Sequence, residues 1–191
     1  NINKKIVLIE KPLYENHKNI KLKNNRYLVG YNLRFHPVIQ FLKKEKLKVL
    51  FITNLLGFCG DLNKIKEICD KEEIILLEDN CESLGSEFEG IKLGNFSLAS
   101  TCSFFVGHHL STIEGGMVNT NDKELYEMLL MLRSHGWAKD LSAESSRALM
   151  KKYDIDEFHS PFTFFIPGYN LRSTEISAAI GIEQLKKLKY I

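Results

Sequence analysis

Two short apolar runs with an amphipathic stretch between them constrain the fold more than any other feature of this 191-residue chain. Residues 49–53 (VLFIT) and 74–77 (IILL) are typical of strands buried on both faces. Between them, aliphatic side chains recur at helical spacing behind Asp61, a helix-capping residue type: Leu62, Ile65 and Ile68. The order strand, helix, strand predicts a β-α-β unit with parallel strands.

Further strands and helices are predicted on both sides of this unit. Lys5 to Ile9 is a short apolar run of strand type. SEFEGIKLG predicts a hairpin that turns at Glu89-Gly90, LASTCSFFV predicts a buried strand over residues 98–106, and GGMVNT predicts a strand that begins at Gly115-Gly116. These elements favour the α/β class with a mostly parallel sheet.

The last third of the chain is predicted to hold two helices. Asn121 caps a helix that runs to about Arg133, and residues 138–165, which include Pro161, are polar and predicted to be irregular. Ser173 is expected to open the final helix, because its apolar residues keep the helical period: Ile176, Ala179, Ile180 and Leu185.

Composition indicates an ordinary globular domain. The chain is 44% hydrophobic and 26% charged, which suffices to bury a core. No window approaches the roughly 20 continuous apolar residues of a membrane helix, and residues 1–5 are not the start of a signal peptide. We therefore expect a soluble cytoplasmic protein without a membrane partner. The four cysteines are too widely spaced to suggest a zinc site or a disulfide framework, so buried reduced thiols are expected: Cys59, Cys69, Cys81 and Cys102.

The charge is unevenly distributed along the chain. Residues 1–48 hold 12 Lys and Arg but only three acidic residues, a net charge of +9, whereas residues 49–191 carry a net charge of −7. Such a change indicates either a basic arm that binds nucleic acid or phosphate, or two segments of different origin. Because the basic residues are dispersed among apolar runs, we favour the second interpretation and expect no nucleic-acid partner.

Polar residues that follow the apolar runs are the first candidates for a ligand site, because ligands of open α/β sheets gather at the carboxyl ends of strands. Asp79 follows IILLE directly, so its carboxylate is placed to hold a protonated ring nitrogen, a metal ion or a ribose hydroxyl. Alternatively, Asp79 caps a short helix over residues 80–84.

The adjacent pair His108 and His109 follows the strand over residues 98–106. Neighbouring side chains point in different directions, whereas helical zinc pairs stand four residues apart, so we expect no metal site. One catalytic histidine and one packing histidine are the preferred interpretation.

Four segments carry a resemblance to a known family: EDNCESLGSEFEGIKLG, STCSFFVGHHLSTIEGGMV, RSHGW and GYNLRSTEISAAIGIEQLKKL. In this order and spacing, from about Lys48 to the end, the chain resembles the DegT/DnrJ/EryC1/StrS family of pyridoxal-phosphate sugar aminotransferases. The resemblance implies that residues 47–191 form part of the large domain of a pyridoxal-phosphate-dependent transferase of the aspartate aminotransferase type.

The resemblance also implies roles for individual residues. Asp79 would pair with the pyridinium nitrogen of the cofactor, Glu82 would lie at the edge of the ring that bears the 3-hydroxyl, and Ser103 would bind the phosphate. Asn170, in GYN, would reach the phosphate in the neighbouring subunit of a homodimer. Further candidates near the substrate are His135, for which the end of a helix before Gly136 is the alternative role, and Arg172, a neighbour of Asn170.

One residue departs from the aminotransferase pattern. Alignment on Ser103 and on residues 114–116 places His108 where aminotransferases carry the Schiff-base lysine. Imidazole cannot form that covalent link, but it can move protons near neutral pH. With this substitution the chain is similar to the sugar 3-dehydratase branch of the family, above all to the GDP-4-keto-6-deoxymannose 3-dehydratases.

That branch implies a reaction, a cofactor and partners. Pyridoxamine phosphate would condense with the C4 ketone of a nucleotide-linked 4-keto-6-deoxysugar, and His108 would remove a proton from the cofactor so that the C3 hydroxyl leaves. Glutamate would regenerate the amine. This chemistry belongs to the biosynthesis of deoxysugars in surface polysaccharides such as the O antigen.

Residues 1–46 resemble a different family. LIEKPLYEN and YLVGYNLRFHPVIQFLKKE are similar to the glucose-fructose oxidoreductases, in which Glu10, Lys11 and Pro12 would end a Rossmann strand. A strand-ending turn at Lys11-Pro12 is the alternative. Because no G-x-G-x-x-G precedes this motif, we expect no nicotinamide binding.

The chain is therefore interpreted as a short Rossmann-type fragment (residues 1–46) joined to an incomplete transferase domain (residues 47–191). The family's amino-terminal phosphate-binding turn and its carboxy-terminal small domain have no counterpart here, so we expect this chain alone to be inactive or nearly so. The alternatives are a non-catalytic remnant of a sugar aminotransferase and a nicotinamide-dependent sugar oxidoreductase fragment without catalysis.

Overall fold

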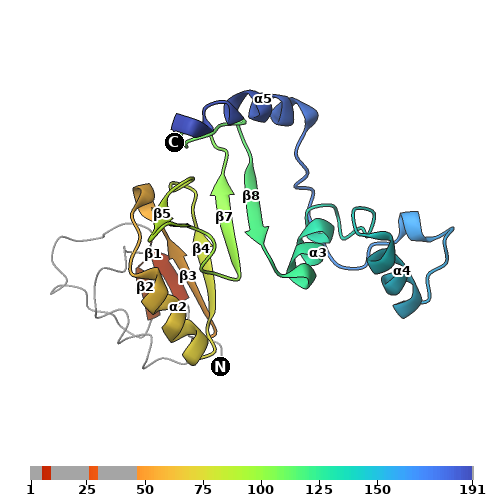
Figure 1. The fold of residues 1–191 in the computed structure, drawn as a ribbon. Helices are drawn as coiled ribbons and strands as arrows, with labels where there is room; N and C mark the ends of the chain where they lie inside the picture. The colour runs from red at the N-terminus through yellow and green to blue at the C-terminus, as the bar shows by residue number, and fades with distance from the viewer. Residues whose placement is uncertain (1–5, 10–25, 30–46, 191) are drawn as a thin grey trace.

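The structure of the protein is a computed structural model that describes Ile6–Ile9 and Arg26–Val29 as strands, together with residues 47–190. Its main sheet has four strands in the order β3-β4-β7-β8 (Figure 1). The strands β3 (Val49–Thr53), β4 (Ile75–Asp79) and β7 (Ala99–Ser103) are parallel, and β8 (Gly116–Thr120) is antiparallel to β7. The prediction of a mostly parallel sheet in an α/β chain is confirmed.

The β-α-β unit is present as predicted. Helix α2 (Leu62–Lys71) connects β3 to β4, and the side chain of Asp61 accepts a hydrogen bond of 3.0 Å from the amide of Lys64. The buried residues of α2 are Leu62, Ile65 and Cys69. Ile68 is only half-buried, because position 69 lies two helical turns beyond position 62 and takes the place against the sheet.

The main core lies between α2 and one face of β3 and β4. Its buried members come from these elements and from the loop before β7: Leu50, Ile52, Leu62, Ile65, Cys69, Ile74, Leu76 and Phe96. Burial of each aliphatic side chain contributes about 1.5–3 kcal/mol. On the opposite face, Val49 and Phe51 remain 44% and 42% exposed. The described residues therefore cover the face of β3 and β4 that packs against α2 and leave the opposite face exposed.

A buried carboxylate joins three segments at the carboxyl end of β4. Glu78 is fully buried and accepts hydrogen bonds from the amides of Gly94 (2.9 Å) and Phe96 (3.2 Å) and from the side chain of Asn54 (3.1 Å). The same Asn54 amide also donates to the side-chain oxygen of Asn80 at 2.7 Å. Glu78 thus fixes the loop after β3 and the loop before β7 to the central strand.

We predict that Glu78→Gln lowers the free energy of unfolding by about 1–3 kcal/mol, because the new amide nitrogen cannot accept a bond from a buried N–H group. Urea denaturation followed by circular dichroism measures the change. Glu87→Gln is the matched control: it alters an exposed carboxylate that pairs with Lys92 at 2.9 Å, and such surface pairs contribute at most about 1 kcal/mol. Equal effects of the two variants would contradict the anchoring role of Glu78.

The predicted hairpin is confirmed. Strands β5 (Glu87–Phe88) and β6 (Ile91–Lys92) pair antiparallel, and the two turn residues Glu89 and Gly90 have φ of +51° and +79°. Two successive positive φ values are those of a type I′ turn, which matches the twist of paired strands.

The strand predicted over residues 98–106 is shorter in the structure. β7 ends at Ser103, and the amide of the next residue, Phe104, donates a hydrogen bond to the carbonyl of Gly115.

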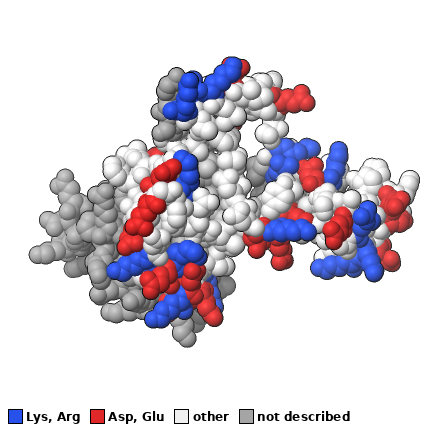
Figure 2. Space-filling view, in the orientation of Figure 1, with Lys and Arg blue, Asp and Glu red and all other residues white. Residues whose placement is uncertain are grey.

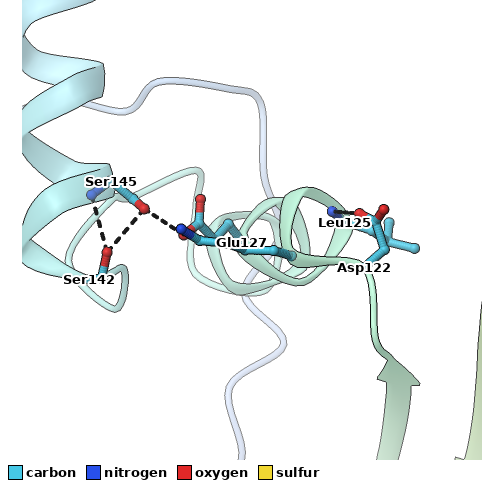
Figure 3. Close-up of polar contacts among 6 residues, drawn as sticks. Asp122, Leu125, Glu127, Ser142 and Ser145 are labelled. Carbon is cyan, nitrogen blue, oxygen red and sulfur yellow. Dashed lines mark hydrogen bonds and ion pairs between the residues drawn. The ribbon is translucent and has the colours of Figure 1, made fainter.

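Two predictions about the helical region are wrong. Asp122, not Asn121, caps α3 (Lys123–Leu132), because its carboxylate accepts from the amide of Leu125 at 2.7 Å. The segment expected to be irregular contains α4 (Ala143–Lys152). Ser142 caps α4 by accepting from the amide of Ser145, whose hydroxyl in turn donates to Glu127 of α3 (Figure 3). This contact with α3 supports a helix that has few apolar residues.

The final helix, α5 (Glu175–Leu185), begins one residue later than predicted, because Thr174 and not Ser173 accepts the hydrogen bond from the amide of Ser177. Its helical period is confirmed, but α5 contributes no buried residue within the described part of the chain. Ile176 is 74% exposed.

The charged side chains are unevenly distributed over the surface. Figure 2 shows a largely uncharged central surface, with charged side chains of both signs concentrated elsewhere.

Short elements complete the described structure. Three 3-10 helices span Leu55–Gly57, Ser160–Phe162 and Leu188–Tyr190. Strands β1 (Ile6–Ile9) and β2 (Arg26–Val29) pair parallel in a sheet of their own. The first agrees with the strand expected over residues 5–9, whereas the motif Glu10-Lys11-Pro12 lies outside the described residues. None of the described helices is long and apolar enough to cross a membrane.

Candidate functional site

The carboxyl ends of the parallel strands bring the candidate residues to one edge of the sheet. In the register of the sheet, Thr53 of β3 is the partner of Asp79 in β4, and Asp79 is the partner of Thr101 in β7. Ser103 ends β7 two residues later, and His108 follows it in the loop to β8. Asp79, Ser103 and His108 therefore belong to the same edge, where ligands of open α/β sheets bind.

The two carboxylate oxygens of Asp79 have different environments. Oδ1 accepts hydrogen bonds from the hydroxyl of Thr101 (2.8 Å) and from the amide of Cys81 (3.1 Å), whereas Oδ2 accepts none from the described residues. The bond to Cys81 closes a turn, and the following residues form successive turns instead of the alternative helix over residues 80–84. Asp79 is half-buried, so Oδ2 can accept a hydrogen bond from a ligand.

Glu82 and Ser103 each have unused hydrogen-bonding capacity. The Oε2 atom of Glu82 is buried and has no hydrogen-bond partner among the described residues, although buried polar atoms are normally paired. The hydroxyl oxygen of Ser103 accepts from the amide of Phe105 at 3.2 Å, which leaves its hydrogen available to an anion. Both positions are compatible with a polar ligand at this edge of the sheet.

His108 and His109 differ in burial. His108 is half-buried, its Nδ1 is buried without a partner, and its ring meets that of Phe105 edge-on at a centroid distance of 5.7 Å. Neither ring nitrogen of His108 has a hydrogen bond in the described structure, so the imidazole can exchange a proton with a ligand. His109 is exposed, so it is not the packing histidine that one of the pair was expected to be.

Cys102 lies in β7 between Thr101 and Ser103, but its chemistry differs from theirs. Partial burial raises the pKa of the Cys102 thiol, and the side-chain amide of Asn119 donates a hydrogen bond of 3.5 Å to its sulfur. A thiol with a raised pKa is a poor nucleophile at neutral pH. Of the four cysteines only Cys69 is buried, so the expectation of buried thiols holds for that residue alone. No group of three metal-ligating residues occurs among the described residues.

His135, Asn170 and Arg172 belong to a different part of the structure. β8 runs antiparallel to β7 and returns the chain to the opposite edge of the sheet, from which α3 continues (Figure 1). Asn170 then pairs with Ser134 in an isolated bridge after α3, and its side chain is exposed. Arg172 is exposed as well. These residues are not placed beside Asp79 by the elements of one chain.

His135 lies in the turn that follows α3 and precedes Gly136, in agreement with its alternative role. Its φ is +62°, and the amide of Gly136 bonds back to the carbonyl of Met131 at 2.8 Å. Its ring contacts those of Trp137 and Phe164 edge-on. The geometry thus supports a structural role for His135, and its role near a substrate stays a prediction.

Gly136 and Gly168 meet where the chain before α5 crosses the end of α3. A Cβ atom on Gly168 would overlap the nitrogen of Gly136 and approach the carbonyl carbon of His135 to 2.5 Å. A Cβ atom on Gly136 would overlap the carbonyl oxygen of Ile166. The contacted atoms belong to the backbone and cannot rotate away, so positions 136 and 168 both require glycine.

We predict that Gly168→Ala lowers the free energy of unfolding by about 3 kcal/mol, because the methyl group separates two backbone segments. Urea denaturation followed by the fluorescence of Trp137, the single tryptophan, reports this contact directly. Gly107→Ala is the control, since its Cβ would meet the rotatable ring of Phe105 at 3.2 Å. An unchanged midpoint in Gly168→Ala would contradict the close approach.

Sequence reasoning missed two contributors to this site. Thr101 was predicted only as part of a strand, and its bond to Asp79 depends on the register of β4 and β7. Glu78 was predicted only as the end of the run IILLE. A carboxylate in a buried strand is itself a signal of a hydrogen-bonded anchor, because such groups are almost never buried without hydrogen bonds.

The sequence profile of the DegT/DnrJ/EryC1/StrS aminotransferase family matches residues 30–191. The chain belongs to this family. The match includes residues 30–46, part of the segment predicted to be an oxidoreductase-like fragment, and the comparisons do not confirm that second resemblance. A domain boundary at residue 46 stays a prediction.

Individual members of the family are similar to the chain over most of its length. The chain is 46% identical over 144 residues to a GDP-4-keto-6-deoxy-D-mannose 3-dehydratase of Yersinia pseudotuberculosis, and the match covers 75% of the chain and 36% of that protein. A UDP-4-amino-4,6-dideoxy-N-acetyl-beta-L-altrosamine transaminase of Helicobacter pylori is 33% identical, with 80% and 36% covered. The chain thus spans little more than a third of these relatives.

Solved structures of the family share the fold. The Escherichia coli GDP-4-keto-6-deoxy-D-mannose-3-dehydratase with bound hydrated PLP has a TM-score of 0.71 and 34% identity, and the match covers 96% of the chain and 48% of that protein. A GDP-4-keto-6-deoxymannose-3-dehydratase with a trapped PLP-glutamate geminal diamine has a TM-score of 0.72, with the same identity and coverage. These matches confirm the predicted transferase fold.

Proposed function

We propose that the chain is part of a pyridoxamine-phosphate-dependent 3-dehydratase that acts on a nucleotide-linked 4-keto-6-deoxysugar. The observation that carries the proposal is His108, a half-buried imidazole that has no hydrogen-bond partner among the described residues and stands where lysine is expected in aminotransferases. A lysine would bind the cofactor covalently, whereas a histidine is suited to proton transfer. The names of the 3-dehydratase relatives agree with this assignment.

The residues at the edge of the sheet fit a pyridoxamine phosphate. Within the described part of the chain, Oδ2 of Asp79 and the buried Oε2 of Glu82 have no hydrogen-bond partner. Oδ2 can accept from a ring N–H group, and Oε2 from a hydroxyl on the ring. Ser103 has a hydroxyl hydrogen available for a phosphate oxygen. When bound, the cofactor supplies an amine for the sugar ketone and a ring that accepts electrons.

His108 performs the proton transfers in this proposal. Its Nδ1 is enclosed, so Nε2 is the nitrogen that can reach a bound group, take a proton from it and return that proton to the departing hydroxyl. Asp79 keeps the ring nitrogen protonated by accepting its hydrogen bond, which favours the flow of electrons into the ring.

The partners of this reaction are part of the same proposal. Nucleotide-linked sugars appear in the names of the relatives, and the PLP-glutamate geminal diamine in one of the similar solved structures supports glutamate as the amino donor. In the proposed homodimer, Asn170 reaches the cofactor phosphate of the other subunit. This agrees with two observations: Asn170 is exposed, and it lies in a different part of the fold from Asp79.

The first test is a titration of the purified chain with pyridoxamine phosphate, followed by absorbance and thermal shift. We predict that Asp79→Asn weakens binding about 10- to 100-fold, because a charged hydrogen bond contributes about 1.5–3 kcal/mol. Asp70→Asn, which removes an exposed carboxylate that pairs with Lys66, should bind as the unaltered chain does. The proposal is wrong if the unaltered chain shows no saturable binding.

A second test asks whether residue 108 occupies the position of the family's lysine. We predict that His108→Lys forms a covalent bond with the aldehyde of pyridoxal phosphate, which borohydride reduction makes permanent and peptide mass mapping locates. His109→Lys provides the matched control, because residue 109 is exposed and adjacent. Labelling of both variants to the same extent would indicate ordinary surface lysines and refute the assignment of His108.

A sugar aminotransferase is the second candidate, since the family profile and the Helicobacter relative are of that class. It requires a lysine or an equivalent amine in the site. The nearest lysine along the chain before His108 is Lys92 in the exposed hairpin, where it pairs with Glu87. Histidine at position 108 therefore favours dehydration.

A further inference from the structure

We infer that Thr101 is a positioning residue for Asp79, orienting the carboxylate so that Oδ2 faces the pyridinium N–H of the cofactor. The inference rests on the proposed function and adds a residue to it. Its basis is the hydrogen bond of 2.8 Å from the Thr101 hydroxyl to Oδ1 of Asp79.

The register of the sheet makes this contact direct. Asp79 and Thr101 are Cα partners across the parallel strands β4 and β7, so their side chains project on the same side of the sheet. The backbone carbonyl of Thr101 also accepts from the amide of Asn80 at 2.9 Å, which fixes the chain immediately after Asp79. Thr101 therefore constrains both the carboxylate and the backbone that carries it.

The hydrogen bonds of Asp79 leave one direction for a ligand. Oδ1 is bound by two donors that come from different elements, Thr101 in β7 and the amide of Cys81 in the turn. Two donors on one oxygen fix the rotation of a carboxylate about its Cβ–Cγ bond better than one donor does. Without the Thr101 hydroxyl, the bond from Cys81 is the one that remains among the described residues, and the carboxylate gains freedom to turn Oδ2 away.

The alternative explanation is that Thr101 merely stabilises the strand. Its hydroxyl is part-buried, so its loss would then lower stability without any specific effect on Asp79. Thr120 in β8 offers a comparison, because its hydroxyl donates to the carbonyl of Leu98 at 2.7 Å in the same sheet but contacts no candidate site residue.

The test compares Thr101→Val, Thr101→Ser and Thr120→Val in the full 191-residue chain. The first readout is the carboxyl carbon resonance of Asp79 in unliganded, 13C-labelled protein. We expect it to shift in Thr101→Val, to return in Thr101→Ser and to stay unchanged in Thr120→Val. No shift in Thr101→Val, or a shift that serine does not reverse, would overturn the inference.

The second readout is the affinity for pyridoxamine phosphate. We expect Thr101→Val to weaken binding about 10-fold, as loss of a hydrogen bond to a charged group does, and Thr101→Ser to restore it. Equal affinities of Thr101→Val and Thr120→Val would refute the positioning role. If the unaltered chain binds no cofactor, the proposed function fails, whereas the resonance of Asp79 still decides whether Thr101 holds its carboxylate.

Discussion

The buried carboxylate of Glu78 holds together the part of the structure on which the candidate site depends. It receives donors from the loop after β3 and from the loop before β7, so strands that are distant in the sequence are tied to β4. A carboxylate without these donors would be costly to bury. The next residue, Asp79, is thereby held in a fixed position at the end of the strand, where it is a candidate for binding a ligand.

The fold was predictable where local patterns determine it. Apolar runs around an amphipathic stretch identified the β-α-β unit, and Glu89-Gly90 identified the hairpin turn. Helix starts were misplaced by one residue, because two capping residue types stand side by side at Asn121-Asp122 and at Ser173-Thr174. Only the structure shows which side chain reaches the amide. Helix α4 was missed although Ser142 is a capping residue type, and its contact from Ser145 to Glu127 of α3 is a tertiary one that no local pattern reveals.

The candidate site was predictable in its individual residues but not in its connections. Asp79, Ser103 and His108 follow apolar runs, so their place at one edge of a parallel sheet follows from topology. The contribution of Thr101 depends on the pairing of β4 with β7, and strand register is a long-range property. His135 and Asn170 were proposed for the same site, yet β8 carries the chain away from it. A second chain is the proposed source of Asn170.

The divided hydrogen bonding of Asp79 gives its side chain a part in folding as well as in the candidate site. One oxygen stabilises the turn after β4, and that contribution to folding persists whether or not a cofactor binds. Loss of this side chain would therefore weaken the turn even in a chain that binds no cofactor. Asp79 thus serves the fold as well as the candidate site, whereas the ring nitrogens of His108 have no hydrogen-bond partner among the described residues and contribute nothing comparable to the fold.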